Sequence, residues 1–150
     1  MIKEIIPNLW FDGNAKEAVD FYVSVFSESK VLSTIYYPHE GLADFQKEMA
    51  GKVLTVDFEL SGNRFVAINA GPEFKFNESI SFSVPCKDQA EIDYYWDKLS
   101  SVPESEQCGW CKDKYGLSWQ IIPENMEELM QRPNAYINMM QMKKLIINNF

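Results

Sequence analysis

The sequence predicts an α+β protein assembled from two copies of one strand–helix–three-strand unit. The first observation is internal repetition, because Val19-Asp20-Phe21-Tyr22 is echoed by Ile92-Asp93-Tyr94-Tyr95. The second is that an alternating apolar run precedes each tetrad, at 9–11 and at 80–84. Repetition of this kind indicates similar supersecondary units. Two such units imply two half-sheets that form one curled, eight-stranded mixed sheet around a cleft, followed by a C-terminal helical segment.

The first half of the chain carries its strand and helix signals in the order that this unit requires. Asn14 followed by Glu17 has the spacing of a capping box, which predicts the start of a helix with apolar residues at helical spacing up to Phe26. The polar segment 38–51 is expected to be irregular, with one helical turn around Phe45. Strands are expected where β-branched and aromatic residues alternate with polar ones, at 5–11, 30–37, 54–60 and 65–70.

The second half repeats this order after a linker at 71–77. Asp88 with Glu91 forms a second capping-box spacing, ahead of a helix that reaches Leu99. Pro133 breaks the helical pattern of the C-terminal segment. Strands are expected at 79–84, 108–113 and 117–122. We therefore expect a single domain, 1–150, with pseudo-repeats at about 1–70 and 78–123 and a C-terminal extension at 124–150.

Charge and composition exclude several classes of partner. The formal net charge is -8, so phosphate backbones and anionic lipid surfaces repel the chain, and neither nucleic acid nor membrane is an expected partner. No apolar stretch is long enough to span a bilayer, and the start has no signal-peptide pattern, which predicts a cytoplasmic protein. Three cysteines in 150 residues do not form a disulfide framework.

Several motifs together resemble the vicinal oxygen chelate superfamily (glyoxalases, extradiol dioxygenases and bleomycin-resistance proteins), and in particular its PhnB-like branch. Some members of that branch carry a demethylubiquinone methyltransferase label. The matching motifs are Leu9-Trp10-Phe11-Asp12-Gly13, Gly71-Pro72-Glu73-Phe74-Lys75-Phe76, Cys108-Gly109-Trp110, Asp113-Lys114-Tyr115-Gly116-Leu117-Ser118-Trp119-Gln120 and Met142-Lys143-Lys144. They extend the resemblance over nearly the whole chain.

The resemblance implies one divalent metal, held by four positions on the first and last strands of the two units. Here those positions fall around Ile6 and on Asn69, Ser79 and Gln120, and Gln120 stands where metal-binding relatives carry Glu. Amide and hydroxyl side chains are poor ligands for a catalytic transition metal. We therefore expect no metal and no cofactor, unless a shift in strand register brings in a carboxylate such as Glu4. No Gly-rich loop supports the methyltransferase label.

Three further features have both a functional and a purely structural interpretation. Cys108 and Cys111 have redox-motif spacing, but in a strand residues three apart point to opposite faces, which favours two unrelated thiols. The single histidine, His39, is a possible general base in a polar loop. Asp57 and Glu59 share one strand face and are the candidate acid–base residues, although a solvated face of an antiparallel hairpin is the favoured interpretation.

The remaining candidate site residues are those expected to line the cleft. Strand parity places Asn8 and Trp10 on the cleft face, with Leu9 and Phe11 under the helix. Aromatic side chains suit a planar or apolar ligand, and amides and hydroxyls would orient it. The predicted ligand-binding residues are Asn8, Trp10, Asn69, Phe74, Phe76, Ser79, Trp110 and Gln120.

Two functions remain open at this point. The first is a metal-free protein that binds a small molecule. The second is a lyase, isomerase or dioxygenase with a displaced metal site or none, using Asp57 or Glu59 as base. A homodimer is also expected, because the C-terminal segment is more apolar than a lone surface helix requires at Tyr136, Ile137, Met139, Met140, Leu145 and Ile146.

Overall fold

In the computed structural model, which describes residues 1–150, the chain divides into two units, Met1–Lys75 and Phe76–Phe150, hereafter unit 1 and unit 2. The division falls inside the predicted linker 71–77. Both units place a helix on one face of a small mixed sheet, so the α+β class is confirmed. No helix has the length and apolar character needed to cross a membrane.

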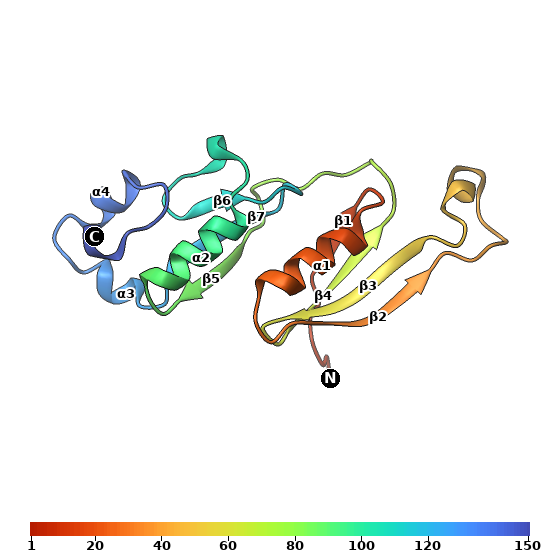
Figure 1. Ribbon diagram of the computed structural model, residues 1–150, viewed down its shortest axis with the longest axis horizontal. Coiled ribbons are helices and arrows are strands. Elements are labelled where there is room, and N and C mark those ends of the chain that lie inside the picture. The colour runs from red at the N-terminus through yellow and green to blue at the C-terminus, as the bar shows by residue number, and fades with distance from the viewer. The chain divides into compact units, whose positions relative to one another are not determined.

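Unit 1 is a four-stranded sheet with one helix across it (Figure 1). The strand order is β1-β4-β3-β2, with β1 parallel to β4 and the other neighbours antiparallel. A 3₁₀ helix at Asp44–Met49 interrupts the connection between β2 and β3. The elements are β1 (Asn8–Phe11), α1 (Ala15–Val25), β2 (Lys30–Tyr36), β3 (Val53–Leu60) and β4 (Asn63–Asn69).

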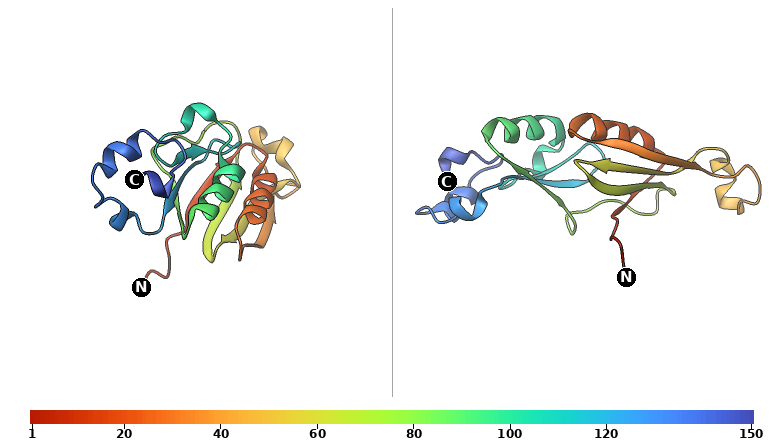
Figure 2. Two further views of the ribbon diagram at one scale, coloured as in Figure 1. Left: turned by 60° about the vertical axis from the view of Figure 1, so that its left-hand side comes forward. Right: turned by 90° about the horizontal axis from the view of Figure 1, so that it is seen from below.

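The core of unit 1 lies between the sheet and α1, which covers one sheet face (Figure 2). Residues on alternate strand positions are buried, as the sequence pattern predicts. Leu9 and Phe11 are buried while Asn8 is exposed, which confirms the predicted parity of β1. The strand residues of this core are Leu9, Phe11, Val56, Phe58, Leu60, Phe65 and Ala67.

Unit 2 repeats the arrangement with a smaller sheet of order β5-β7-β6. β5 is parallel to β7, and β6 is antiparallel to it. Short 3₁₀ helices lie at Pro103–Ser105 and Ile147–Asn149. The elements are β5 (Phe82–Cys86), α2 (Gln89–Leu99), β6 (Trp110–Lys112), β7 (Ser118–Pro123), α3 (Met126–Leu129) and α4 (Ala135–Met140).

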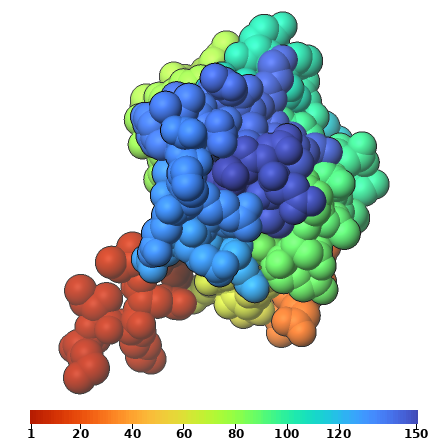
Figure 3. Space-filling view, turned by 90° about the vertical axis from the view of Figure 1, so that its left-hand side faces the viewer, coloured from red at the N-terminus to blue at the C-terminus, as the bar shows by residue number.

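The C-terminal segment folds back on itself and forms one continuous surface of unit 2, drawn in blue in Figure 3. It has its own small core of Leu129, Ala135, Leu145 and Phe150. Leu145 is therefore buried and is not free for an interface, whereas Tyr136, Ile137 and Met140 are 62%, 58% and 41% exposed. The homodimer stays a prediction.

The structure contains seven strands in two sheets, in place of the single eight-stranded sheet that we expected. The repeat would place the missing strand in the polar stretch 100–107, to which the sequence pattern assigns no strand. There Pro103 begins a 3₁₀ helix, and only an isolated bridge joins Gln107 to Trp110. Proline has no N–H to donate to a strand ladder, which explains the loss. The opening strand of unit 2 begins at Phe82, later than predicted, so Ser79 precedes it.

The two predicted capping boxes have different outcomes. At α2 the Asp88 carboxylate accepts a hydrogen bond from Glu91 N (2.9 Å), and Glu91 in turn accepts one from Lys87 N (2.9 Å). At α1 the Asn14 side chain makes no capping hydrogen bond. There the cap comes from Asn69, which lies 54 residues away along the chain and accepts a hydrogen bond from Ala15 N.

Candidate functional site

The sheet of unit 1 has an open face, opposite α1, on which most of the predicted site residues of this unit lie. The open face of unit 1 is defined here by the half-buried and exposed side chains of alternate strand positions: Asn8, Trp10, Thr55, Asp57, Glu59, Arg64, Val66 and Ile68. Strand pairing brings Asn8 beside Val66 and Trp10 beside Ile68. Apolar and charged side chains therefore lie next to one another on this face.

Trp10 is the aromatic centre of this face. Its indole Nε1 donates a hydrogen bond to Gly71 O (2.9 Å), and its ring meets that of Phe74 edge to face, with centroids 4.8 Å apart. Phe74 is 64% exposed, so the pair presents apolar ring surface to solvent. Two predicted ligand-binding residues are thus brought together, and the hydrogen bond to Gly71 fixes the orientation of the indole.

The predicted acid–base residue Asp57 is paired with a cation. Arg64 Nε and Nη2 donate to the two Asp57 carboxylate oxygens at 2.9 and 2.6 Å, and Arg64 Nη1 donates to Glu4 at 2.6 Å. The hydrogen bonds from Arg64 lower the pKa of Asp57 from its ordinary value. A carboxylate with a lowered pKa is a weak base at neutral pH. Glu59 lies 3.8 Å from Lys30 Nζ.

The Asp57→Asn variant is expected to differ most from the wild type in stability at neutral pH. A carboxyl group whose pKa is lowered on folding stabilises the protein above its ordinary value of 3.8, and that stabilisation disappears as pH falls through the lower folded pKa. Urea denaturation from pH 7 to pH 3 should show the difference shrinking below about pH 4. Asp20→Asn, in the exposed Lys16 pair, is the control, and a pH-independent difference for Asp57→Asn would contradict this assignment.

Asn69 lies on the face that packs against α1, because it pairs with the buried Phe11 across β1 and β4. Its Oδ1 accepts from Ala15 N (2.9 Å), and its Nδ2 donates to Val53 O (3.1 Å). Its backbone carbonyl accepts a hydrogen bond from the Tyr37 hydroxyl (2.6 Å). Asn69 thus joins the ends of β2, β3 and β4 to the first turn of α1, on the face opposite Trp10.

In unit 2 the predicted residues Trp110 and Gln120 are cross-strand partners on the sheet face opposite α2. Both are half-buried, and Gln120 Nε2 donates to Ser81 Oγ at 2.9 Å. Ser79 is exposed, and its N–H and hydroxyl both donate to Asn77 Oδ1 in a turn before β5. Phe76 is half-buried at the start of the unit.

The residues at the expected metal positions do not fit a divalent metal. Asn69 already uses its carbonyl oxygen as a helix cap, and the Gln120 amide nitrogen is bonded to Ser81. Neither side chain, nor that of Ser79, offers the imidazole or carboxylate donors that such ions take. Within either unit, no three histidine, cysteine, aspartate or glutamate side chains converge.

The cysteines lack the environment of a reactive dithiol. Burial raises the pKa of Cys86 and of Cys111 to about 12, and burial also raises that of Cys108. Cys111 is on β6, whereas Cys108 is in the preceding turn with a backbone φ of 39°. The thiolate is the nucleophilic form, so these shifts make all three side chains less reactive than a free cysteine.

Native protein is therefore expected to react slowly with a thiolate-specific disulfide reagent near neutral pH. Cys108, which is half-buried, should react first, and Cys86 and Cys111 should react only after denaturation in guanidinium chloride. The measurement is the time course of thiol release before and after unfolding. Cys108→Ser should remove the early phase, and two fast native thiols would instead favour the redox interpretation.

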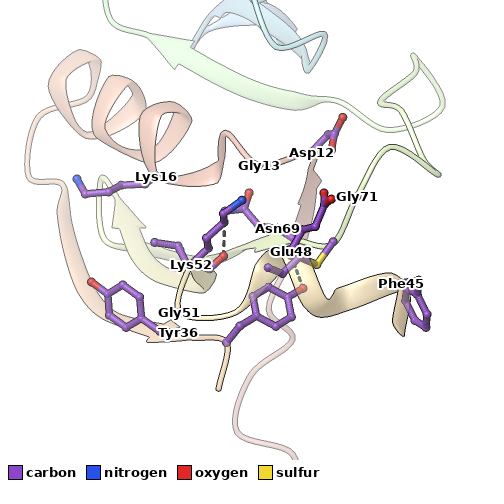
Figure 4. Close-up of a pocket in the computed structure, with 13 residues that line it drawn as sticks. Asp12, Gly13, Lys16, Tyr36, Phe45, Glu48, Gly51, Lys52, Asn69 and Gly71 are labelled. Carbon is purple, nitrogen blue, oxygen red and sulfur yellow. Dashed lines mark hydrogen bonds between the residues drawn. The ribbon is translucent and has the colours of Figure 1, made fainter. Parts of the chain in front are cut away.

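A pocket of about 510 Å³ lies on the α1 side of unit 1, between the first turn of the helix and the 3₁₀ helix at Asp44–Met49 (Figure 4). We call it the helix-side pocket. Only Asn69 among its lining residues was predicted as a site residue. The others that concern us are Asp12, Lys16, Tyr36, Phe45, Glu48 and Lys52. They belong to the turn before α1, the first turn of α1, the end of β2, the 3₁₀ helix and the loop before β3. The approach of these segments depends on tertiary structure, so no local sequence signal identified them.

His39 lies beside this pocket in the loop 38–51. Its ring packs against Gly51, where an added Cβ would come within 2.6 Å of His39 Cε1. Gly51 also has a φ of 72°, so glycine is required there on two counts. Two backbone hydrogen bonds close the base of the loop: Tyr37 N donates to Lys52 O (2.8 Å), and Gly51 N donates to Tyr37 O (3.1 Å). His39 is exposed, and its ring contacts Gly51.

Comparison with known families identifies one family model that matches residues 3–122, described as 3-demethylubiquinone-9 3-methyltransferase. A PhnB protein of Bacillus cereus with the same methyltransferase description is 33% identical, and the match covers 81% of this chain and 99% of that one with a TM-score of 0.65. No curated protein matches the chain.

More distant solved structures share the fold. The protein PA1353 of Pseudomonas aeruginosa is 18% identical, with 82% of this chain and 98% of that chain covered and a TM-score of 0.61. The fosfomycin resistance protein FosX of Mesorhizobium loti is 12% identical, with coverages of 88% and 100% and a TM-score of 0.56. At these identities the likeness concerns the fold alone.

Proposed function

Because the chain belongs to the PhnB-like family described as 3-demethylubiquinone-9 3-methyltransferase, within the vicinal oxygen chelate superfamily, we propose that it binds a small organic molecule without a resident metal. The observation that carries the proposal is that both polar atoms of the Asn69 side chain are already hydrogen-bonded within the protein. A side chain at an expected ligand position is instead committed to Ala15 N and Val53 O, on the helix-facing side of the sheet.

The binding surface that we propose is the open face of unit 1 around Trp10. The edge-to-face pair of Trp10 and Phe74 offers exposed aromatic surface, which suits a planar or apolar ligand. The exposed Asn8 amide donates to Ile6 O and has its carbonyl oxygen available to orient such a ligand. In unit 2, Trp110 and Gln120 offer a comparable aromatic and amide pair.

The enzymatic alternative would use Asp57 or Glu59 as a base. Asp57 is the better placed of the two, but its two hydrogen bonds from Arg64 favour the charged carboxylate and so weaken it as a proton acceptor. Glu59 faces the Lys30 ammonium group. These contacts favour binding over acid–base catalysis by the same residues.

The first test is calorimetric titration of protein purified without an affinity tag with Zn, Mn, Ni and Fe(II). We expect no stoichiometric binding to the native protein. Tight binding of one metal per chain would overturn the proposal and support the lyase or dioxygenase alternative. Glu4→Gln, Asp57→Asn and Glu59→Gln would then locate the ligands.

The second test is a screen of planar aromatic compounds followed by tryptophan fluorescence. Trp10→Phe and Phe74→Ala should each weaken binding of a compound that quenches the wild type, by about tenfold for loss of an aromatic contact. Trp96→Phe, a half-buried tryptophan on α2, is the matched control and should leave the affinity unchanged. Equal losses for Trp10→Phe and Trp96→Phe would count against the open face as the site.

A further inference from the structure

We propose that the helix-side pocket of unit 1 binds a zwitterion of the ω-amino acid type, in which a carbon chain separates the two charges, with the ligand's ammonium group at Asp12 and Glu48 and its carboxylate at Lys16 and Tyr36. Trp10 does not line this pocket and meets it only through its hydrogen bond to Gly71, so the proposal does not depend on the open face being a binding site. Its volume of about 510 Å³ is within the range of small-molecule sites.

The acidic end of the pocket has two carboxylates without protein partners. Asp12 comes from the turn between β1 and α1, and Glu48 from the 3₁₀ helix, and neither forms a hydrogen bond or an ion pair. The nearest lysine in sequence to Glu48, Lys47, is instead paired with Asp44 at 2.6 Å. Two carboxylates from different elements on one side of a pocket form a site for an ammonium group.

The opposite end carries positive charge. Figure 4 shows Lys16 and Tyr36 on one side of the pocket and Asp12 and Glu48 on the other, with Asn69 between them. Lys16 pairs with Asp20 across one helical turn, but both side chains are more than half exposed, so a ligand carboxylate can displace this weak pair. Lys52, which also lines the pocket, has no ionic partner.

The walls and the floor between the two ends suit the body of such a ligand. Tyr36 and Phe45 are 58% and 78% exposed, so the carbon chain of the ligand would cover ring surface that is otherwise in water. The floor is rigid, because Tyr37 and Asn69 are buried and joined by the 2.6 Å hydrogen bond. A rigid floor lowers the cost of ordering the site on binding.

The experiment is an NMR titration of the ¹⁵N-labelled full chain with a panel of ω-amino acids of increasing chain length, and with 6-aminohexanoic acid, its N-acetyl derivative and its amide as the matched probes. At least one ω-amino acid of the panel should shift the amides of 12–16, 36–37 and 45–53. Removing either charge of the ligand should weaken binding about tenfold, because each charge makes charge-assisted hydrogen bonds.

Variants then assign the two ends. Glu48→Gln should weaken binding of the best amino acid about tenfold and should abolish its preference over the N-acetylated form, whereas Glu40→Gln, in the same loop but outside the lining, should change nothing. Tyr36→Ala should weaken binding, with the equally exposed Tyr136→Ala as control. Phe74→Ala, at an exposed residue of the open face that does not line the pocket, should have no effect, which separates this site from the open face.

The proposal is overturned if no amino acid of the panel shifts these amides at millimolar concentration, or if derivatives lacking one charge bind as well as the parent. Shifts confined to Trp10 and Phe74 would also overturn it, and would support the open face instead. Loss of binding in Glu40→Gln as well as Glu48→Gln would show that net charge, and not the pocket, is responsible.

Discussion

Replacing Asp113 with asparagine is expected to lower the free energy of unfolding by about 2–4 kcal/mol, and replacing it with alanine by about 3–5 kcal/mol. The Asp113 side chain is 1% exposed. Its Oδ1 accepts hydrogen bonds from Tyr115 N (2.8 Å) and Leu117 N (3.1 Å), and its Oδ2 accepts one from the Trp119 indole (2.9 Å). This carboxylate therefore shapes the 113–117 turn and connects it to β7.

The physical reason is the loss of an acceptor for buried N–H groups. Asparagine can keep the two backbone bonds, but its amide nitrogen would face the Trp119 Nε1–H, leaving two donors opposed. Alanine has no carboxylate, so the N–H groups of Tyr115, Leu117 and the Trp119 indole all lose the acceptor that Asp113 provides. A buried donor that loses its partner keeps its full cost of desolvation.

Chemical denaturation followed by fluorescence and circular dichroism measures the effect. Trp119→Phe provides the double-mutant cycle: once the indole N–H is gone, Asp113→Asn should cost less than it does alone. Ser118→Ala is the matched control, because Ser118 is equally buried and its hydroxyl has no hydrogen-bond partner, so its removal should change stability by less than about 0.5 kcal/mol. Strict additivity of the two substitutions would contradict the assigned contact.

Replacing Asn69 with alanine is the second change expected to have a large effect, about 2–4 kcal/mol of lost stability. The variant removes the cap on Ala15 N and leaves the Val53 carbonyl without its side-chain donor. Asn69→Asp should fall between the wild type and alanine, because a carboxylate can still cap α1 but cannot donate to Val53. The helix N-terminus favours the negative charge.

Asn14→Ala is the control that separates the local prediction from the tertiary one. Sequence spacing assigns the cap of α1 to Asn14, but its side chain makes no capping bond, so we expect its substitution to cost less than about 0.5 kcal/mol. Thermal and urea denaturation of both variants measure the comparison. A larger loss for Asn14→Ala than for Asn69→Ala would restore the capping box.

Predictions based on local periodicity agree closely with the structure. The alternation of β3 places Val56, Phe58 and Leu60 in the core and Asp57 and Glu59 on the other face. The period of two is a property of every extended strand, so burial parity can be read without knowing which strands pair. The capping box at Asp88 is likewise local, because both of its partners lie within four residues.

Predictions failed where a distant residue completes the interaction. Asn69 caps a helix that begins 54 residues earlier in the chain, and Arg64 joins Asp57 across a hairpin and Glu4 from the N-terminal segment. The number of strands also depends on pairing, because the polar stretch 100–107, where the repeat would place an eighth strand, contains a 3₁₀ helix that begins at Pro103. Each of these interactions depends on a residue that is distant in sequence and is brought close only by the folded structure.

By itself, the sequence determined the α+β class, the family, the helices α1 and α2, the faces of β1 and β3, and the division of the chain near residues 71–77. Only the tertiary structure decided that Asp57 is held by Arg64, that Asn69 faces α1, and that Asp12, Lys16 and Glu48 line one pocket. The physical reason is the range of the forces involved. Backbone geometry and side-chain periodicity act within a few residues, whereas ion pairs, buried hydrogen bonds and pockets form between segments that the fold brings together.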